Sequence, residues 1–179
     1  MRVTVIPDPL NLAWPRAYGL CLLRPVTEHD VDDILAYRSR PEVARFLTHP
    51  VLNRDAVLAR IHQRIRPLTV DAREVTRGLA VEVKGRLVGD AMMRVDHTDE
   101  ETGPRVWIGY AFNPEAWGKG YATDTATCLT RAGTAMGLRV WADTVPGNVG
   151  SERVLTKAGL HLVGVQVVGN GPRNVFASD

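Results

Sequence analysis

The chain has 179 residues, with 22 lysines and arginines against 20 aspartates and glutamates, and a formal net charge of +2. This near balance gives no support for a general nucleic-acid-binding protein. The 45% hydrophobic and 23% charged content is that of a globular protein and argues against a disordered or fibrous chain. The length is that of one domain.

Targeting and redox features favour a cytoplasmic protein. No apolar stretch approaches the ~20 residues that a membrane span needs, and the first residues lack the basic start and apolar core of a signal peptide. The two cysteines, Cys21 and Cys128, form no C-x-x-C pair, which removes the usual zinc and dithiol patterns. We therefore expect a soluble cytoplasmic protein with no metal and no membrane partner.

The first half of the chain predicts a proline-rich arm and then the start of one domain, with the boundary between residues 19 and 20 and the domain running to residue 179. Apolar residues at helical spacing predict two helices, the second capped by Asn53. In chain order we expect an irregular arm, a strand, a helix, a helical turn, a helix and a polar loop over residues 1–19, 20–23, 28–38, 44–47, 53–67 and 69–77.

The second half alternates in a strand-like way before a helical pattern returns. Three strands over 79–83, 87–95 and 105–112 predict an antiparallel meander, with a tight turn at Lys84-Gly85 and an acidic loop over 96–104. The remaining expected elements are a helix, a strand, a helix, a strand, a turn and a strand over residues 121–136, 138–144, 150–158, 160–168, 169–172 and 175–177. This order is mixed α/β and disfavours a doubly wound dinucleotide fold.

A glycine-containing loop between a strand and a helix is the segment most suggestive of chemistry. Gly118 and Gly120 let a ligand approach the backbone, the first helical amides lack partners, and the helix N-terminus favours an anion. Lys119 adds a charge nearby. Neither G-x-G-x-x-G nor the P-loop pattern is present. The loop therefore indicates a phosphate or pyrophosphate site, or simply a tight strand-to-helix connection.

The loop resembles the acetyl-CoA-binding motif Q/R-x-x-G-x-G/A of the GNAT N-acetyltransferases. Trp117 stands where Gln or Arg is common, Gly120 matches the central glycine and Ala122 the last small residue. A second match, Asn148-x-x-Ser151 followed by Leu155-x-Lys-x-Gly-Leu160, is similar to the RimJ/RimL branch, which acts on ribosomal-protein N-termini. In that branch a phenylalanine usually stands at position 160.

The resemblance implies the GNAT fold, a mixed and mostly antiparallel sheet of six to seven strands flanked by about four helices. It implies acetyl-CoA as co-substrate, with its pantetheine arm between two splayed strands, 105–112 and 138–144. Backbone groups near Ala111 and Phe112 and the side chain of Asn148 would contact that arm. The pyrophosphate would lie on the amides of Trp117, Gly118, Lys119, Gly120, Tyr121 and Ala122.

The resemblance further implies direct acetyl transfer to a primary amine, without a covalent enzyme intermediate. Many GNAT enzymes place a tyrosine acid at the position of Leu155, and leucine cannot donate a proton. The RimJ/RimL-like branch makes Ser151, with Asn148 beside it, the candidate general acid. Serine is also favoured as a helix N-cap, so Ser151 is expected to cap the following helix as well or instead.

The general base stays open in the sequence. Glu82, Asp90 and Asp143 lie on or near expected strands, and each is equally explained as a structural or solvated acid. Cys128 lies in a helical pattern and is expected in the core rather than as a nucleophile.

We therefore expect an acetyl-CoA-dependent N-acetyltransferase that acts on a peptide α-amine or a small-molecule amine, as a monomer or homodimer. Two alternatives remain open at this point: a non-catalytic acyl-CoA-binding domain of the same fold, or a glycine loop that holds another phosphate ligand. Neither the amine acceptor nor an acyl group larger than acetyl is specified by the sequence.

Overall fold

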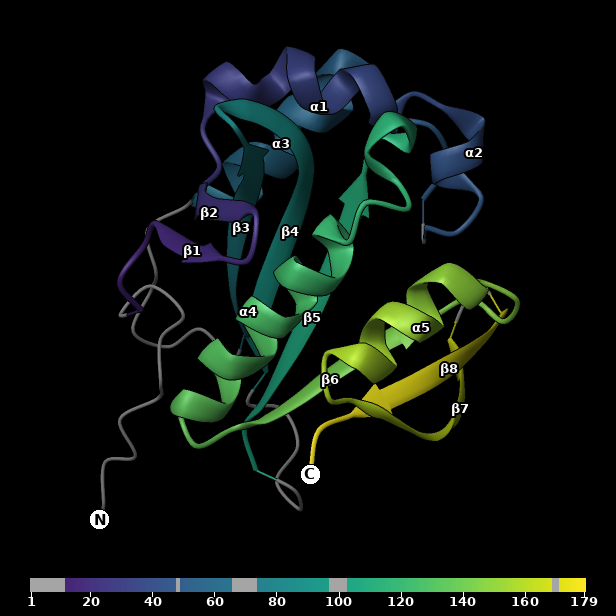
Figure 1. Cartoon of the computed structure of the whole chain (residues 1–179). Coiled ribbons are helices and arrows are strands. Elements are labelled where there is room, and N and C mark those ends of the chain that lie inside the picture. Colours follow the sequence, from purple (N-terminus) through teal and green to yellow (C-terminus); the bar gives the residue numbers. More distant parts are fainter. Residues whose placement is uncertain (1–11, 48, 66–73, 97–102, 169–170) are drawn as a thin grey trace.

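A computed structural model describes residues 12–47, 49–65, 74–96, 103–168 and 171–179 (Figure 1). The helices of the described chain are η1 (Glu28–Asp30), α1 (Val31–Arg38), α2 (Pro41–Ala44), α3 (Arg54–Ile65), η2 (Pro114–Ala116), α4 (Tyr121–Ala135) and α5 (Val149–Lys157). The strands are β1 (Arg16–Tyr18), β2 (Cys21–Pro25), β3 (Glu74–Val83), β4 (Arg86–Asp96), β5 (Arg105–Phe112), β6 (Arg139–Thr144), β7 (His161–Val168) and β8 (Gly171–Ala177).

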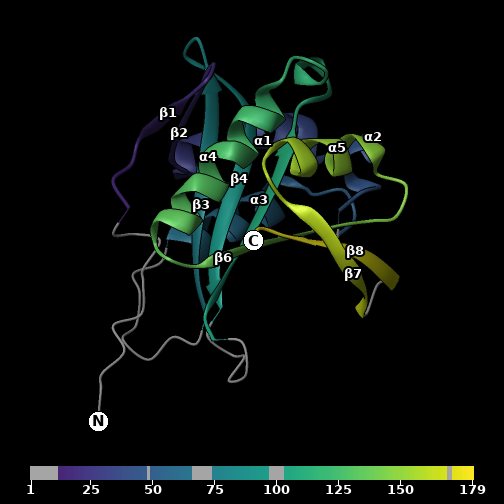
Figure 2. The same ribbon diagram turned by 60° about the horizontal axis from the view of Figure 1, so that its bottom comes forward.

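The strands form a mixed sheet in the order β1-β2-β3-β4-β5-β6-β8-β7. All neighbours are antiparallel except β5 and β6, which run parallel and are connected through α4. Figures 1 and 2 show α4 and α5 over one face of this sheet, with α1 and α3 at the other. The sheet therefore lies between two layers of helices.

Each face of the sheet has its own apolar core. Alternate residues of β5, such as Val106 and Ile108, pack with Leu129 of α4 and Leu155 of α5. On the opposite face the core joins Ile34 of α1, Val57 and Ile61 of α3, and Ala111 of β5. Successive side chains of β5 therefore point alternately into the two cores.

The sheet opens between β5 and β6. These strands pair only where Arg105–Trp107 face Arg139–Trp141. From Trp141 onward β6 pairs with β8 on its other edge, as far as Thr144. In Figure 1, β6, β8 and β7 diverge from the upright β5. The C-terminal half of β5, residues 108–112, therefore has no strand partner on this side, and the expected splay is present.

Most elements expected from the sequence are confirmed in type and place. Asn53 caps α3 by accepting a hydrogen bond from the amide of Ala56 at 2.9 Å. Lys84 and Gly85, at φ of 51° and 73°, make the tight turn between β3 and β4. Cys128, on α4, is buried in the core, as expected.

Several expected bounds were wrong in detail. The helical turn expected over 44–47 lies earlier, as α2, because the helix begins at Pro41, and residues 171–172 of the expected turn belong to β8. Residues 74–77, expected in a loop, belong to β3, because Glu74–Arg77 continue the hairpin opposite Met93–Asp96 of β4. Residues 16–18 of the expected irregular arm form β1 against β2. The expected mixed and mostly antiparallel sheet flanked by helices is confirmed; with β1 included, the described sheet has eight strands, and the described chain has five α-helices.

Several expectations fall on segments outside the described residues: most of the arm (1–11), the start of the polar loop (69–73), the centre of the acidic loop (97–102) and the turn at 169–170. No helix of the described chain is long and apolar enough to cross a membrane.

Candidate active site

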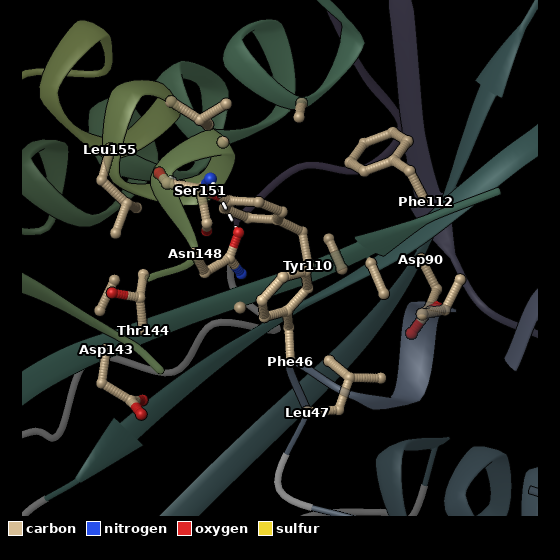
Figure 3. Close-up of a pocket in the computed structure, with 18 of the residues that line it drawn as sticks. Phe46, Leu47, Asp90, Tyr110, Phe112, Asp143, Thr144, Asn148, Ser151 and Leu155 are labelled. Atoms are coloured by element: carbon tan, nitrogen blue, oxygen red, sulfur yellow. Dashed lines mark hydrogen bonds between the residues drawn. The ribbon is translucent and has the colours of Figure 1, made fainter. Parts of the chain in front are cut away.

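A pocket of about 590 Å³ lies at the splay between β5 and β6 (Figure 3). At one end it reaches Trp117, Gly118 and Ala122, where α4 begins. At the other end it reaches Arg60 and Arg64 of α3, on the opposite side of the sheet. The opening in the sheet therefore joins two chemically different ends of one cavity.

The glycine loop has the conformation that an anion site requires. Gly118 and Gly120 adopt φ of +73° and +85°, in the left-handed region that favours glycine. A Cβ at either position would meet no atom within 4 Å, so backbone geometry, and not crowding, requires glycine there. Gly120 is also the N-cap of α4 and offers no side-chain oxygen to the first amides of the helix. Those amides are consequently available to an external anion.

Trp117 ties this loop to the end of β5. Its indole Nε1 donates a hydrogen bond to the carbonyl oxygen of Phe112 at 3.0 Å, while the residue stays 47% exposed. The tryptophan thus fixes the loop against the splayed strand and still presents a flat apolar surface to solvent at the pocket mouth.

The peptide groups of β5 divide between the two sides of the strand. The amide of Asn113 donates to the carbonyl of Val88 at 2.9 Å, so Phe112 and its partner Gly89 form a non-hydrogen-bonded pair. Alternation then directs the peptide groups of Tyr110 and Phe112 into the opening and those of Ala111 toward β4. Ala111 therefore lines the pocket, but its own amide and carbonyl point toward β4. The backbone groups that face the opening near this position are those of Tyr110 and Phe112.

A buried hydroxyl on β6 also fits a polar ligand. Thr144 lines the pocket, and its Oγ1 is buried without a hydrogen-bond partner among the described residues. An unpaired buried hydroxyl is costly, and an amide-bearing arm passing between β5 and β6 would supply its partner. Glycine loop, open strand edges and this hydroxyl together match the demands of an extended phosphate-bearing ligand.

Asn148, Ser151 and Tyr110 meet at the centre of the pocket (Figure 3). The Asn148 Oδ1 accepts from the amide of Ser151 at 3.2 Å and caps α5. Ser151 itself lies inside the first turn of α5, so the expectation that it caps this helix was wrong. Its Oγ lies 2.9 Å from the Tyr110 hydroxyl, and either oxygen can donate. Burial raises the pKa of Tyr110 well above its usual range, so the phenol stays protonated.

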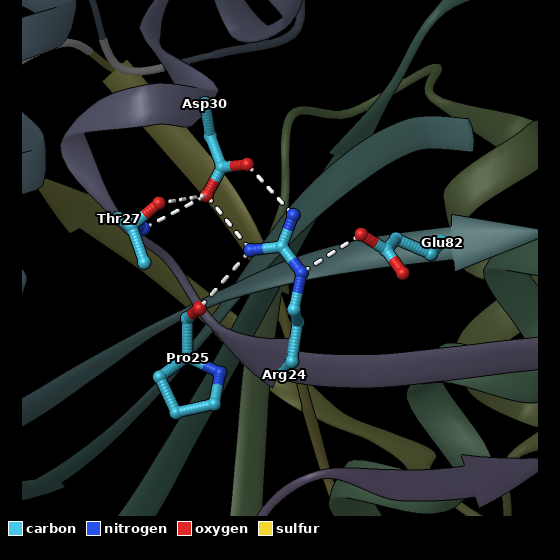
Figure 4. Close-up of polar contacts among 5 residues, drawn as sticks. All are labelled: Arg24, Pro25, Thr27, Asp30 and Glu82. Carbon is cyan, nitrogen blue, oxygen red and sulfur yellow. Dashed lines mark hydrogen bonds and ion pairs between the residues drawn. The ribbon is translucent and has the colours of Figure 1, made fainter. Parts of the chain in front are cut away.

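Glu82 is a structural acid (Figure 4). Its Oε1 accepts from Arg24 Nε at 2.8 Å, and the same guanidinium binds both oxygens of Asp30, at 2.7 and 2.9 Å. Asp30 in turn accepts from the amide of Thr27 at 2.8 Å. The network joins β2, β3 and the start of the helical layer, and Glu82 does not line the pocket.

Asp90 lines the pocket but is fully engaged. Its carboxylate accepts from Tyr37 at 2.6 Å, from Arg38 at 2.9 and 2.6 Å, and from Arg64 at 3.2 Å. Burial opposes its ionisation, but the charges and hydrogen bonds of Arg38 and Arg64 prevail and lower the pKa to about 2. A carboxylate with so little proton affinity is a poor general base at neutral pH.

Asp143 is the remaining candidate base, and it lines the pocket from β6. Its carboxylate is 38% exposed and lies 3.7 Å from Nε of Arg173, too long for a hydrogen bond. The adjacent Ala142 belongs to the core under α4 and α5, so alternation places Asp143 on the opposite face of the sheet, where the arginines of α3 lie.

The pocket collects most, but not all, of the residues singled out in the sequence. Among them, Lys119, Gly120 and Tyr121 do not line the pocket. Lys119 and Gly120 are exposed at its mouth, and Tyr121 packs against the core. The lining residues expected from sequence are Ala111, Phe112, Trp117, Gly118, Ala122, Asn148 and Ser151, together with Asp90 and Asp143.

Two features were missed from the sequence. Tyr110 lies in the motif-bearing strand, but its contact with Ser151 joins residues 41 positions apart. Arg60 and Arg64 share the inward face of α3 with Val57 and Ile61. Charged residues at helical spacing within an apolar face were the available signal for this cluster.

Comparison with known proteins identifies the family. The family model described as "Acetyltransferase (GNAT) domain" matches residues 21–161. The chain belongs to the GNAT acetyltransferases. It is an N-acetyltransferase whose acetyl donor is acetyl-CoA. The described ranges contain no group of three or more His, Cys, Asp or Glu side chains that could hold a metal ion.

Individual relatives agree with this membership. The chain is 28% identical over 148 residues to the uncharacterized N-acetyltransferase YoaA of Bacillus subtilis, covering 80% of this chain and 81% of that protein. It resembles the structure of AAC(6')-Ib with paromomycin and acetyl-CoA (TM-score 0.72, 19% identity, 89% and 93% coverage). It also resembles RimL, the ribosomal L7/L12 alpha-N-protein acetyltransferase, with coenzyme A (TM-score 0.72, 14% identity, 91% and 96% coverage). These two structural likenesses show a shared GNAT fold.

Proposed function

We propose that this GNAT acetyltransferase transfers the acetyl group directly from acetyl-CoA to a primary amine held in the same pocket. The observation that carries the proposal is the splay between β5 and β6, which opens between the glycine loop and the hydroxyl pair of Tyr110 and Ser151. Such an arrangement holds two substrates on either side of one reacting centre, and proximity supplies much of the acceleration.

The donor occupies the α4 end of the pocket in this proposal. The amides from Trp117 to Ala122 hold the pyrophosphate, where the helix N-terminus favours negative charge. The peptide groups of Phe112 and the hydroxyl of Thr144 bind the pantetheine arm along the splay, and Asn148 flanks its thioester end. Side-chain charge has a small part here, since Lys119 is exposed.

Ser151 is the proposed general acid. As the C–N bond forms and the C–S bond breaks, the Ser151 hydroxyl at the α5 end of the splay gives its proton to the departing sulfur. The attacking nitrogen loses its remaining extra proton in the same step, and this proton restores the Ser151 hydroxyl. Tyr110 is a positioning residue, because its hydroxyl 2.9 Å away holds Oγ in place. Leu155 lines the same pocket and offers no proton.

Asp143 is the proposed base for the ammonium form of the acceptor. It lies on the acceptor side of the sheet and is partly solvated, so it can receive a proton directly or through one water. Asp90 is excluded from this role by its three hydrogen-bonding neighbours and lowered pKa.

The finer assignment to the RimJ/RimL-like branch is also part of the proposal. It is supported by the Asn148-x-x-Ser151 motif. A cytoplasmic location belongs to the same proposal and is compatible with two free buried cysteines, Cys21 and Cys128.

Thiol release with an amine panel tests the proposed reaction. Purified protein, acetyl-CoA and a range of primary amines are expected to give free CoA in proportion to acetylated amine, identified by mass. Release in Ser151→Ala should fall while binding of acetyl-CoA stays. Acetyl-CoA binding without transfer to any amine, peptide N-termini included, would support instead a non-catalytic acyl-CoA-binding domain.

A further inference from the structure

At the acceptor end of the pocket, the positive charges of the arginines outnumber the negative charges of the carboxylates. Five arginines line the whole pocket, against three carboxylates. Three of the arginines, Arg38, Arg60 and Arg64, lie at the end formed by α1 and α3, and Asp90 is the acid there that pairs with two of them. This end therefore carries a net positive charge in its interior.

Arg38 and Arg64 are held by Asp90. Arg38 binds both carboxylate oxygens, at 2.9 and 2.6 Å, and Arg64 binds one at 3.2 Å. Gly78 of β3 makes room for Arg64, since a Cβ at that glycine would come within 2.8 Å of the Arg64 side chain. These two guanidinium groups are fixed parts of the wall.

Arg60 is different. It lies one turn before Arg64 on the same face of α3 and lines the same pocket. It makes no hydrogen bond or salt bridge with any residue of the described chain. Burial, together with the positive charges of Arg64 and Arg38, lowers the pKa of Arg60 to about 10. It remains charged at neutral pH, in a place that favours an incoming anion.

His49, which lies next to Arg38, is affected by the same positive charges. Arg38 Nη1 lies 3.1 Å from His49 Nε2, and His49 Nδ1 lies 2.8 Å from the carbonyl oxygen of Pro50. Nε2 therefore accepts and Nδ1 donates, which is the neutral form. Burial lowers the pKa of His49, and the nearby arginines lower it further, so it adds no charge.

The remaining acids do not cancel Arg60. Glu42, on α2, is exposed at the rim of the pocket. Asp143 lies across the pocket on β6, beside Arg173. A second cation placed against Arg60 would meet like charge in a partly desolvated site, which costs affinity.

We infer that the amine acceptor also carries an anionic group, a carboxylate or a phosphate, and that Arg60 binds this group at the α3 end of the pocket. The inference rests on the proposed function, since it names the acceptor class for that reaction. The planar guanidinium fork matches both oxyanions, and the amine end then points toward the splay and Asp143. Polyamines and other polycationic acceptors are disfavoured.

A set of amines with four carbon atoms tests the charge preference. 4-Aminobutanoate, n-butylamine and 1,4-diaminobutane differ mainly in the charge of the distal end, and 2-aminoethyl phosphate adds a phosphate arm. We expect kcat/KM to be about 10- to 100-fold higher for the better oxyanion than for n-butylamine, as for a hydrogen bond to a charged group, and lowest for the diamine. Preference for the diamine or indifference to charge would overturn the inference.

Arg60→Gln assigns the preference to one residue. It should remove most of the anion preference and raise KM for the anionic amine, while KM for acetyl-CoA stays unchanged. Arg54→Gln is the matched control on the same helix, because Arg54 is exposed and pairs with Asp32 at 3.1 Å. An unchanged anion preference in folded Arg60→Gln protein would contradict the assignment.

Binding separates this inference from the proposed reaction. Calorimetric titration of the same amines into the CoA-saturated protein should show tighter binding of the anionic amine, lost in Arg60→Gln. That result without any acetyl transfer would support the anion site and contradict the proposed reaction. Transfer to amines with anionic and neutral amines bound and used equally would support the reaction and contradict the anion site.

Discussion

The two ends of the pocket achieve recognition by different physical means. At the α4 end, backbone does the work: two left-handed glycines and the free amides of a helix N-terminus present partial positive charge without a buried side-chain charge. At the α3 end, full charges on Arg38, Arg60 and Arg64 surround Asp90. The first end is exposed and relies on backbone conformations that favour glycine, whereas at the second end Asp90 is buried and held by Tyr37, Arg38 and Arg64.

This difference assigns separate roles in stability and in binding. Removing one member of a buried ion network leaves an uncompensated charge and destabilises the fold. Altering the exposed glycine loop costs only the local backbone strain of a left-handed residue and mainly affects what binds there. Variants at the two ends should therefore fall into two classes that stability and affinity measurements separate.

The largest effect on stability is expected for Asp90→Asn. The change leaves Arg38 and Arg64 buried without a counter-charge, so the free energy of unfolding should fall by about 3–5 kcal/mol. Chemical denaturation measures the loss. Asp32→Asn, which breaks an exposed pair with Arg54, should cost less than about 1 kcal/mol. Equal losses in the two variants would show that the Asp90 network does not stabilise the fold.

Gly120→Asp should weaken acetyl-CoA binding by at least about 100-fold, because a carboxylate then faces the pyrophosphate across the amides of α4. Gly85→Asp is the matched control, since Gly85 has a similar φ of +73° and equally open surroundings but lies in a hairpin turn. Both should lose similar stability from backbone strain. Unchanged affinity in folded Gly120→Asp would contradict the placement of the pyrophosphate.

At the junction of the two ends, Ser151→Ala should lower kcat by about 100-fold, as for loss of a general acid, with KM for acetyl-CoA unchanged. Tyr110→Phe keeps the ring but loses the hydroxyl that holds Ser151 Oγ, so a smaller fall of about tenfold is expected. Tyr18→Phe, on β1, serves as control. A larger loss in Tyr110→Phe than in Ser151→Ala would make Tyr110 the proton donor instead.

Acid should weaken the α3 end before the α4 end. The pKa of Asp90 falls from 3.8 to about 2 on folding, so its stabilisation is complete above pH 4 and disappears as the pH falls toward 2. The linked free energy is about 2 kcal/mol. Unfolding free energies measured between pH 5 and 2 should therefore drop more steeply in the wild type than in Asp90→Asn. Parallel curves would contradict this origin of acid sensitivity.

The smallest effect is expected for Lys119→Gln. Because Lys119 is exposed and does not line the pocket, screening by solvent limits its contribution. Affinity for acetyl-CoA should fall by only about two- to fivefold. A loss as large as that of Gly120→Asp would show that side-chain charge, and not backbone, holds the donor.

Local sequence patterns led to the prediction of an anion site at the α4 end. The arginine cluster at the α3 end was missed, because it depends on contacts between residues far apart in the sequence. The glycines and the helix that follows them lie in one short stretch, so an anion site could be proposed there from the sequence alone. The network of Asp90 joins a strand to α1 and α3, with partners 26 to 53 positions away. No local period reveals which carboxylate will meet which arginine.

The errors in the fold have a similar cause. Residues 74–77 include Glu74, Thr76 and Arg77, and their polarity suggested a loop, yet backbone pairing with β4 does not depend on apolar side chains. β1 is only three residues long and follows Pro15, which concealed it. Ser151 was an equally good cap by residue type, but Asn148 begins the helix three residues earlier.

Titration of acetyl-CoA, CoA and ADP into the purified protein by calorimetry tests the central claim most directly. The arrangement of glycine loop, splayed strands and central hydroxyls predicts that acetyl-CoA binds much more tightly than ADP, because the pantetheine arm adds contacts along β5 and β6. Folded protein that binds neither acetyl-CoA nor CoA would contradict the account of this pocket.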